Sequence, residues 1–340
     1  MVDTSSTASG KSGLPPAALI DIGAWQVVTA TGADRVTFLH RLLTAQIEGL
    51  GPGEGQRALL LTVKGHVVVD LYVFVREESV RILVPPGEGE ATAAALSRYA
   101  IMDDVALVLE PTLRVGAVFG AEAPSRLAEV GLTVPPNVAA GGAFRHADVP
   151  APGLGGGVAA AWVARVPGYG TPDGFFVVGD SGMVDSLGAA LAQKGVPTLS
   201  AETAESLRIG AGEPKFGAEI TSEVFPMEAG LDGLIDYTKG CYLGQEPIVR
   251  IRDRGHINWR LVGLRMRDGG EAAPGDRLES ESKPKAGRVT SVAAAPGGAR
   301  VALALLHVSI PEGSPITVRH GEVGVPADVV AAGGAPAGGR

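Results

Sequence analysis

Three apolar segments separated by very short turns constrain the fold of this chain more than any other feature. They span residues 58–63, 66–75 and 80–84, and the turns between them are Lys64–Gly65 and Arg76–Ser79. Turns of this length join antiparallel strands, because a parallel pair needs a crossover of about a dozen residues or more. The segments therefore predict an antiparallel, three-stranded meander.

Helical patterns flank this meander. Apolar residues recur at intervals of three and four positions after a start marked by Gly32 and Asp34, which predicts a helix packed on the sheet. Residues 88–100 predict a second helix and residues 104–110 a further strand, so that the whole forms a mixed unit of α+β class. The recurring apolar residues of the first helix are Val36, Leu39, Leu43, Ile47 and Leu50.

The next stretch reuses the same kinds of element. Residues 141–157 are loop-rich, and residues 210–256 are dense in glycine, proline and charge without clean periodicity. Irregular stretches of this kind carry sites more often than cores. The predicted strands are 113–119, 159–165 and 174–178, and the predicted helices are 124–130, 183–194 and 201–209.

After Trp259 the pattern changes to short β-like runs separated by glycine and proline turns, which predicts a small barrel or sandwich. We place the domain boundary near Asn258. The predicted organisation is a disordered tail at 1–13, an α+β region at 14–258 with subunits of about 14–110 and 111–258, a C-terminal β-barrel at 259–328 and a disordered tail at 329–340.

The composition is that of a globular protein without membrane spans. Hydrophobic residues make up 45% of the chain and charged residues 19%, and no apolar stretch approaches the ~20 residues that span a bilayer. The single cysteine cannot form an internal disulfide and no signal segment opens the chain, so we expect a cytoplasmic protein. A net charge of −8 argues against a surface that binds nucleic acid throughout.

Cys241 is the strongest candidate for chemistry. A lone cysteine is often a small buried hydrophobe. Here, however, Lys239 precedes it, Gly240 and Gly244 flank it, and Pro247 fits the first turn of a helix that begins just after it. A cation and a helix N-terminus both favour a thiolate, so we interpret Cys241 as a reactive thiol. One cysteine cannot hold an all-thiolate metal cluster, and any such cluster would be transient and shared.

Two charged features accompany the thiol. Residues 250–267 hold six arginines against one acid, Asp253, which indicates either a solvated basic face or a site for a glutamylated cofactor tail, a phosphate or RNA. Asp70 stands in an apolar strand and needs either a partner, a cavity or the backbone N–H groups of a strand end. The histidines show no metal-ligand spacing; they include His66, His146, His256, His307 and His320.

The segment 239–246, which reads Lys-Gly-Cys-Tyr-Leu-Gly-Gln-Glu and is followed by Arg250 and Arg254, closely resembles the signature of the YgfZ family. Members of that family are folate-binding proteins related to the glycine-cleavage T-protein. The resemblance covers about residues 16–325. Other segments that resemble the family are 32–39, 61–70, 207–208, 212–214, 225–228, 287–291 and 302–304.

This resemblance implies a T-protein-like fold of two mixed α/β units around a cavity the size of tetrahydrofolate, with an antiparallel β-barrel beside it. It implies work in the assembly or repair of iron-sulfur proteins, including enzymes that modify transfer RNA. The cofactor would be tetrahydrofolate or a polyglutamylated folate. The partners would be iron-sulfur client or assembly proteins, with the arginine run as a candidate RNA contact and no membrane.

The chain departs from the T-protein at two positions. Of two adjacent aspartates in the T-protein hairpin, the one assigned to catalysis has Val69 as its counterpart here, which leaves Asp70. The glutamate that holds the pterin is replaced by Gly210, and the backbone or Glu213 would have to substitute for it. We therefore favour a non-catalytic folate-binding factor over the alternative, a tetrahydrofolate-dependent aminomethyl or methyl transferase that uses Asp70.

The resemblance also assigns candidate roles. Cys241 is the reactive thiol or transient ligand, and Lys239 lowers its pKa. A third hypothesis is a binding module that docks RNA or a protein through the arginine run. The candidate folate-binding residues are Asp70, Arg208, Glu228, Lys239, Gly240, Tyr242, Gly244, Gln245, Glu246, Arg250 and Arg254.

Overall fold

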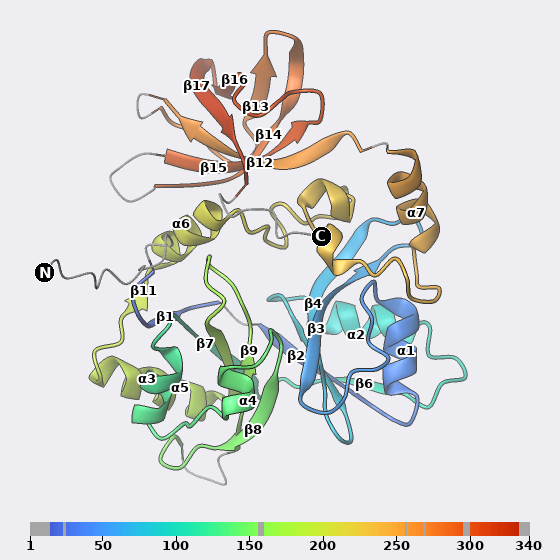
Figure 1. The fold of residues 1–340 in the computed structure, drawn as a ribbon, viewed down its shortest axis with the longest axis vertical. Coiled ribbons are helices and arrows are strands. Elements are labelled where there is room, and N and C mark those ends of the chain that lie inside the picture. The colour runs from blue at the N-terminus through green and yellow to red at the C-terminus, as the bar shows by residue number, and fades with distance from the viewer. Residues whose placement is uncertain are drawn as a thin grey trace, which may run out of the picture.

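The computed structural model describes residues 14–22, 25–155, 160–255, 257–267, 270–294 and 300–332. Two α+β units lie side by side, and a barrel sits across one end of both (Figure 1). The α+β class and the antiparallel C-terminal barrel are thus confirmed. The predicted tail at 1–13, most of the predicted tail at 329–340, and His256 lie outside the described residues.

The first unit contains the predicted meander as the first three strands of a five-stranded sheet with the order β3-β4-β5-β2-β6, in which β3 is an edge strand. The sequence prediction lacked β2, which pairs antiparallel with both β5 and β6. Its elements are β2 (Gln26–Thr31), α1 (Arg35–Leu42), β3 (Glu54–Leu61), β4 (Val67–Val75), β5 (Val80–Val84), α2 (Gly89–Ser97) and β6 (Ala106–Leu109).

Helix α1 is shorter than predicted. It ends at Leu42, and Leu43 has extended backbone angles, φ −97° and ψ 154°. Leu43 and Ile47 are nonetheless fully buried in the same core as Leu39. The apolar spacing therefore identified the core residues correctly, but the second half of that stretch reaches the core as an irregular loop.

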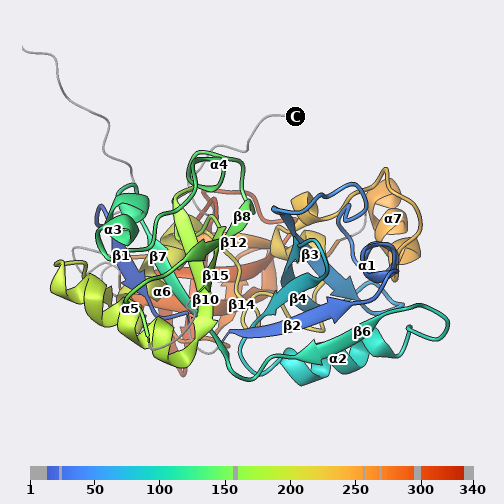
Figure 2. The ribbon, with the colours of Figure 1, turned by 90° about the horizontal axis from the view of Figure 1, so that it is seen from below.

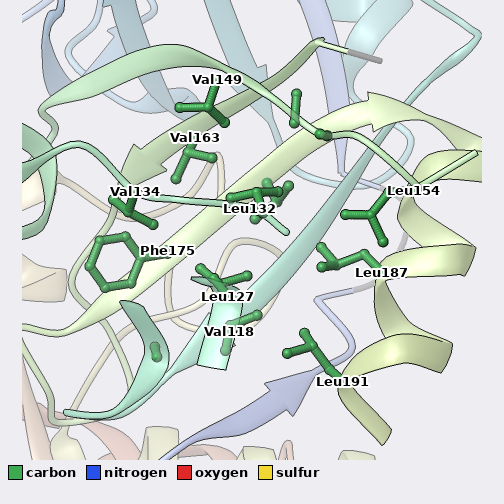
Figure 3. Close-up of a cluster of buried hydrophobic side chains, with 14 of the residues drawn as sticks. Val118, Leu127, Leu132, Val134, Val149, Leu154, Val163, Phe175, Leu187 and Leu191 are labelled. Carbon is green, nitrogen blue, oxygen red and sulfur yellow. The ribbon is translucent and has the colours of Figure 1, made fainter. Parts of the chain in front are cut away.

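The second unit is a six-stranded sheet with the order β11-β1-β7-β10-β9-β8. Its core lies between this sheet and the helices α3 and α5, where Leu127, Leu187 and Leu191 meet Val118 and Phe175 (Figure 3). The elements are β1 (Ala18–Ile20), β7 (Leu113–Phe119), α3 (Ala123–Glu129), α4 (Pro136–Ala139), β8 (His146–Pro150), β9 (Ala160–Arg165), β10 (Gly174–Asp180), α5 (Ser181–Gln193), β11 (Thr198–Leu199) and α6 (Ala201–Ala211).

Two parts of this unit differ from the prediction. Strand β1 belongs to the second sheet, where it pairs with β7 and β11, so the chain does not divide cleanly at residue 110. Strand β8 lies inside the stretch predicted to be loop-rich and pairs with β9 along five residues. Its sequence, His-Ala-Asp-Val-Pro, alternates only weakly, and its order comes from tertiary contacts.

The two sheets pack against each other through an aromatic core. Phe74 and Leu83 from the first sheet meet Trp162 and Phe176 from the second. Figure 2 shows the two units from below, with the barrel strands behind them. The rings of Phe74 and Trp162 lie 4.8 Å apart, centre to centre, across the face between the sheets.

An irregular linker leads into the barrel, which begins with β12 at Trp259, next to the predicted boundary. Six strands close in the order β12-β15-β14-β13-β16-β17. The last strand runs to Val330, two residues beyond the predicted end of the barrel. The elements are η1 (Pro226–Ala229), η2 (Asp232–Leu234), α7 (Gln245–Arg254), β12 (Trp259–Met266), β13 (Arg277–Ser280), β14 (Lys283–Ala294), β15 (Arg300–His307), β16 (Pro315–His320) and β17 (Val323–Val330).

Among the helices of the described residues, none combines the length and the apolar character that crossing a membrane requires.

Candidate functional site

The signature segment is anchored to the end of α1 by Lys239. Its ammonium donates hydrogen bonds to three backbone oxygens there, those of His40, Leu43 at 2.7 Å and Ala45 at 2.9 Å. Helix ends leave such carbonyls without intrahelical partners, so the lysine satisfies them. Burial lowers the pKa of Lys239 to about 8. The three N–H donors of Lys239 are thus used on these oxygens, and its predicted role as the cation beside the thiol stays a prediction.

Tyr242 and Gly244 fix the segment to the hairpin of β3 and β4. Tyr242 is buried in the core beside this hairpin, and its hydroxyl has no hydrogen-bond partner among the described residues. A Cβ added to Gly244 would lie 2.4 Å from the backbone oxygen of Thr62, and its φ is +79°. Only glycine fits such a close approach with a left-handed backbone.

Cys241 points the other way. Its side chain is exposed, and it precedes the first residue of α7, Gln245, by four positions. The predicted helix with Pro247 in its first turn is confirmed. Gly240 is open, since a Cβ there would meet nothing within 4 Å. The signature thus buries its tyrosine, bonds its half-buried lysine to the end of α1 and presents its thiol to solvent.

The six arginines do not form one surface. Arg250 is exposed on α7 and pairs with Glu246, and Arg252 pairs with Asp253 while lying 4.7 Å from the ring centre of Tyr237. Arg254 is the last residue of α7, and the other three members lie at the barrel end of the run. Arg260 donates to the Ile310 oxygen, Arg265 is exposed on β12, and Arg267 pairs with Asp328. Much of the run is therefore paired within the fold, and it divides between α7 and the barrel.

Asp70 has the partner that its buried position requires. Arg57 on β3 binds it through two hydrogen bonds, 2.9 Å from Nε and 2.6 Å from Nη2. Burial would lower the pKa of Arg57, but the Asp70 carboxylate outweighs it and the pKa is raised. The alternative of a strand-end carboxylate bonded to backbone N–H groups is wrong. Val69 is fully buried in the core between the first sheet and the helices α1 and α2, which we call the helix-side core. A residue at position 69 therefore points to the opposite face of the sheet from Asp70.

Aromatic rings surround this ion pair at the face between the two sheets. Tyr72 lies 5.7 Å below the Arg57 guanidinium and 5.5 Å from Trp25, and Phe176 lies 5.9 Å from both rings. Burial raises the pKa of Tyr72 to about 12, so its hydroxyl stays protonated. We call Trp25, Arg57, Asp70, Tyr72 and Phe176 the inter-sheet cluster.

Glu213 is a second acid near the cluster. Its two carboxylate oxygens accept hydrogen bonds from the backbone of Tyr169 at 2.8 Å and Gly170 at 2.9 Å. Its charge acts on both Arg57 and Tyr72. Gly210, by contrast, is exposed, and a Cβ there would meet nothing within 4 Å. The acid nearest the cluster on this segment is therefore Glu213.

Arg208 is a structural residue. Its guanidinium is buried and binds Glu205, the backbone oxygen of Glu213, the carboxylate of Glu219 at 3.0 Å and the hydroxyl of Ser291 at 2.7 Å. Ser291 belongs to β14, so this network joins α6 to the barrel. Glu219 is fully buried. The predicted contact of Arg208 with folate is replaced by these bonds within the protein.

Glu228 is likewise occupied by the backbone. It accepts hydrogen bonds from the amides of Phe225, Asn258 and Trp259, at 3.1 to 3.3 Å. These bonds tie η1 to the first residues of β12. Of the predicted folate-binding residues, Asp70 lies in the inter-sheet cluster, while Lys239, Tyr242 and Gly244 hold the signature segment and Gln245, Glu246, Arg250 and Arg254 lie on α7.

Two cavities lie elsewhere. One of about 520 Å³ is lined by the turn after β4 and the start of β8, and one of about 210 Å³ lies beside Trp259. None of the predicted site residues lines either cavity. Within the described part of the chain, no three histidine, cysteine, aspartate or glutamate side chains gather as a metal site.

Sequence reasoning missed Arg57 and Glu219. A signal for Arg57 existed, because the short turn at 64–65 sets a register in which residue 59 faces Asp70. Position 57 then lies on the same face of the sheet, two residues along, within reach of a long side chain. Glu219 had no comparable signal, since its partner comes from α6 across an irregular loop.

Comparison with known proteins decides the family. The family described as GCVT N-terminal domain matches residues 15–239. The chain belongs to this family. The matched region contains both sheets and the inter-sheet cluster and ends at Lys239, the residue that anchors the signature segment.

Curated relatives extend the likeness to the barrel. The protein named tRNA-modifying protein YgfZ from Yersinia pseudotuberculosis serotype O:1b (strain IP 31758) is 27% identical over 319 residues, which cover 92% of this chain and 91% of the relative. The protein of the same name from Yersinia enterocolitica serotype O:8 / biotype 1B is 27% identical over 282 residues, 82% of this chain and 80% of the relative. The resemblance to YgfZ proteins inferred from the signature is confirmed.

A solved structure shows the same architecture. The glycine cleavage system aminomethyltransferase T from Bartonella henselae superposes with a TM-score of 0.83 over 94% of this chain and 86% of that protein, at 20% sequence identity. The T-protein-like fold of the GCVT family member is therefore confirmed, including the position of the barrel against the two units.

Proposed function

We propose that this protein is a folate-binding accessory factor for the assembly or repair of iron-sulfur proteins, through which it supports tRNA modification. The names of the curated relatives and the fold of the family support the tRNA-related role. Folate is the proposed cofactor, and Cys241 is the proposed thiol that meets the client protein.

The inter-sheet cluster is the observation that carries the folate proposal. A pterin needs a flat apolar face to stack on and carboxylates that accept hydrogen bonds from its ring N–H and amino groups. Trp25, Tyr72 and Phe176 offer aromatic faces within 5.9 Å of one another. Each carboxylate oxygen has two lone pairs, so Asp70 and Glu213 keep acceptor capacity beyond their present bonds. The chemistry of these residues fits the cofactor.

Binding without group transfer suits the same residues. A general base must be free to take a proton, and Asp70 is held by two bonds to Arg57. Because position 69 faces the helix-side core, no second carboxylate joins Asp70 there. We therefore propose a binding factor in preference to an aminomethyl or methyl transferase.

The proposed partner of Cys241 is a protein. The thiol is exposed at the start of α7, where a partner surface can reach it. An iron-sulfur cluster needs about four ligands, so this thiol would supply one ligand and the client protein would supply the others. The alternative is that Cys241 acts on the client as a redox thiol. We do not favour RNA as the partner at this surface, because the arginines divide between α7 and the barrel.

Titration with tetrahydrofolate under reducing conditions, followed by tryptophan fluorescence and calorimetry, tests the proposal. We expect saturable binding that Asp70→Asn weakens by about tenfold or more, since a hydrogen bond to a charged group is worth about 1.5–3 kcal/mol. Asp148→Asn is the matched control, because it removes another carboxylate paired with an arginine. No binding by the unaltered protein would refute the folate assignment.

Two further arms separate the parts of the proposal. Arg250→Ala should weaken only polyglutamylated folate if the tail reaches α7, and equal affinity would remove α7 from the site. Cys241→Ala should lower the activity of iron-sulfur enzymes in cells while leaving folate affinity and unfolding unchanged. Full cellular activity of that variant would remove the thiol from the mechanism, and turnover of a methylamine donor would favour the transferase.

A further inference from the structure

The cavity of about 520 Å³ lies at the junction of the two α+β units. It is formed by the turn between β4 and β5, the start of β8, and residues of β2 and β5. Arg76, on its wall, is six residues beyond Asp70 along β4. A strand rises about 3.3 Å per residue, so Arg76 lies roughly 20 Å from Asp70, while Arg81 on the cavity wall pairs opposite Phe74, two residues from Tyr72 of the inter-sheet cluster.

Arg81 is the most unusual group in this cavity. It stands on the apolar face of the sheet, opposite Phe74, and its guanidinium lies 5.3 Å from the ring centre of Trp162. Among the described residues it has no hydrogen-bond or ion-pair partner, although guanidinium carries five N–H donors. Burial lowers its pKa, and the neighbouring charge of Arg76 lowers it further. Arg81 is half-buried, so its guanidinium donors are open to an acceptor that a ligand supplies.

Arg76 offers a second unfilled donor. Its Nη2 donates to Asp148 on β8, which links the two units. Its Nη1 is buried and has no partner within the part of the chain that the structure describes. His146 supplies no acceptor, because one ring nitrogen contacts the Val75 oxygen at 2.9 Å and the other accepts from Trp162 at 2.8 Å.

Carboxylates line the outer part of the same cavity. Glu77 and Glu78 are exposed on the turn, the Asp148 side chain is 54% exposed, and Glu110 is half-buried close enough to act on the charge of Arg81. The Arg76 side chain is 21% exposed, less than the 54% of Asp148, and Arg81 is half-buried. The cavity therefore has a cationic floor and an anionic rim, and the rim repels polyanions such as nucleotides or RNA.

We propose that this cavity binds a small zwitterion, an α-amino acid or dipeptide, with its carboxylate on Arg81 and Arg76 and its ammonium at Glu110. The guanidinium groups match a carboxylate in geometry and charge. The rim carboxylates match an ammonium group. The volume falls within the 300–1,000 Å³ typical of small-molecule sites, which leaves room for a side chain or a second residue.

Calorimetry with chemically matched probes tests this site. L-leucine and glycyl-L-leucine should bind, whereas N-acetyl-L-leucine, which lacks the ammonium, and L-leucine amide, which lacks the carboxylate, should bind about tenfold more weakly or worse. Equal binding of N-acetyl-L-leucine, or tighter binding of sulfate, would replace the zwitterion site with a simple anion site. No heat or chemical-shift change with either zwitterion would overturn the proposal.

Two variants locate the binding. Arg81→Gln and Glu110→Gln should each weaken L-leucine by about tenfold. Arg114→Gln, at an exposed position on β7, is the matched control and should leave the affinity unchanged. If Arg81→Gln fails to fold by circular dichroism, Glu110→Gln is the deciding variant, because this change keeps the size of the half-buried side chain and removes only its charge. Unchanged affinity in Glu110→Gln would refute the placement of the ammonium.

Discussion

Replacing Arg208 with methionine tests whether this residue holds the fold together or holds a ligand. The substitution keeps the aliphatic volume but removes five hydrogen bonds, to Glu205 (two bonds), the Glu213 oxygen, Glu219 and Ser291. The largest loss of stability should come from Glu219. Its side chain is fully buried, so it would become a carboxylate without its cation in a desolvated position.

The expected loss follows from that unpaired charge. Breaking a buried ion pair by removing one partner costs about 3–5 kcal/mol. Glu219→Gln alone should cost less, about 1–3 kcal/mol, because Arg208 keeps Glu205 and the glutamine can still bond the Lys215 amide. In the double variant, Arg208→Met with Glu219→Gln, no buried charge is left unpaired. Its cost should fall short of the sum of the two single costs by about 1–3 kcal/mol.

Urea unfolding followed by fluorescence measures these three costs, and calorimetry shows whether the barrel melts separately, since the network joins α6 to β14. Arg126→Met is the control, because Arg126 pairs with glutamates on the exposed face of α3 and its loss should change little. If Arg208→Met lost tetrahydrofolate affinity while keeping full stability, the structural assignment of Arg208 would be refuted.

Three further predictions concern other parts of the molecule. Burial lowers the pKa of His146 from 6.5 to about 4, which favours the neutral imidazole in the folded protein by about 3 kcal/mol. This contribution to the free energy of unfolding should be present above pH 6.5 and be lost as the pH falls from 6.5 through 4. The free energy of unfolding, measured with urea across that range, should depend on pH with a slope about one proton smaller in His146→Gln. Gly244→Ala should destabilise the protein by about 2 kcal/mol or more, since its Cβ would meet the Thr62 oxygen at 2.4 Å, while Gly240→Ala, in open space, should not, and equal thermal midpoints would contradict the close packing. Lys239→Met should leave the backbone oxygens of His40, Leu43 and Ala45 without their donor and so speed amide hydrogen exchange in residues 40–45. Lys64→Met, on the exposed hairpin turn, is the control and should not change the exchange there.

Local patterns in the sequence predicted the elements whose order is set by neighbours along the chain. The meander, the helix with Pro247 and the strands of the barrel follow from short turns, alternation and a residue that fits only one helical position. Strands β1 and β8 did not follow, because each is short and pairs with a sheet built from distant segments. Such strands are defined by their partners and not by their own propensity.

The candidate site was predicted less completely than the fold. The signature identified a segment that the structure anchors to the end of α1 through Lys239. Asp70 was correctly expected to have a partner, which is Arg57. The signature could not reveal which of its residues face inward. In the sequence, three residues look like ligand-binding residues: Lys239, Arg208 and Glu228. In the structure each of them forms its hydrogen bonds within the protein. Polar residues beside a functional segment often hold that segment in place.

The exposed thiol of Cys241 lies in a segment whose neighbouring residues are held by the protein. Lys239 and Tyr242 lie on either side of Cys241 and are both held in the protein, one by three carbonyl oxygens and one by a core of apolar side chains. Two residues further on, Gly244 packs against the hairpin of β3 and β4. An exposed residue fixed at both ends has little conformational freedom to lose when a partner binds. Cys241 is therefore presented on a rigid frame, which is the arrangement that a transient ligand to a client protein would need, and loosening the frame with Lys239→Met should impair the cellular role even though the thiol itself is unchanged.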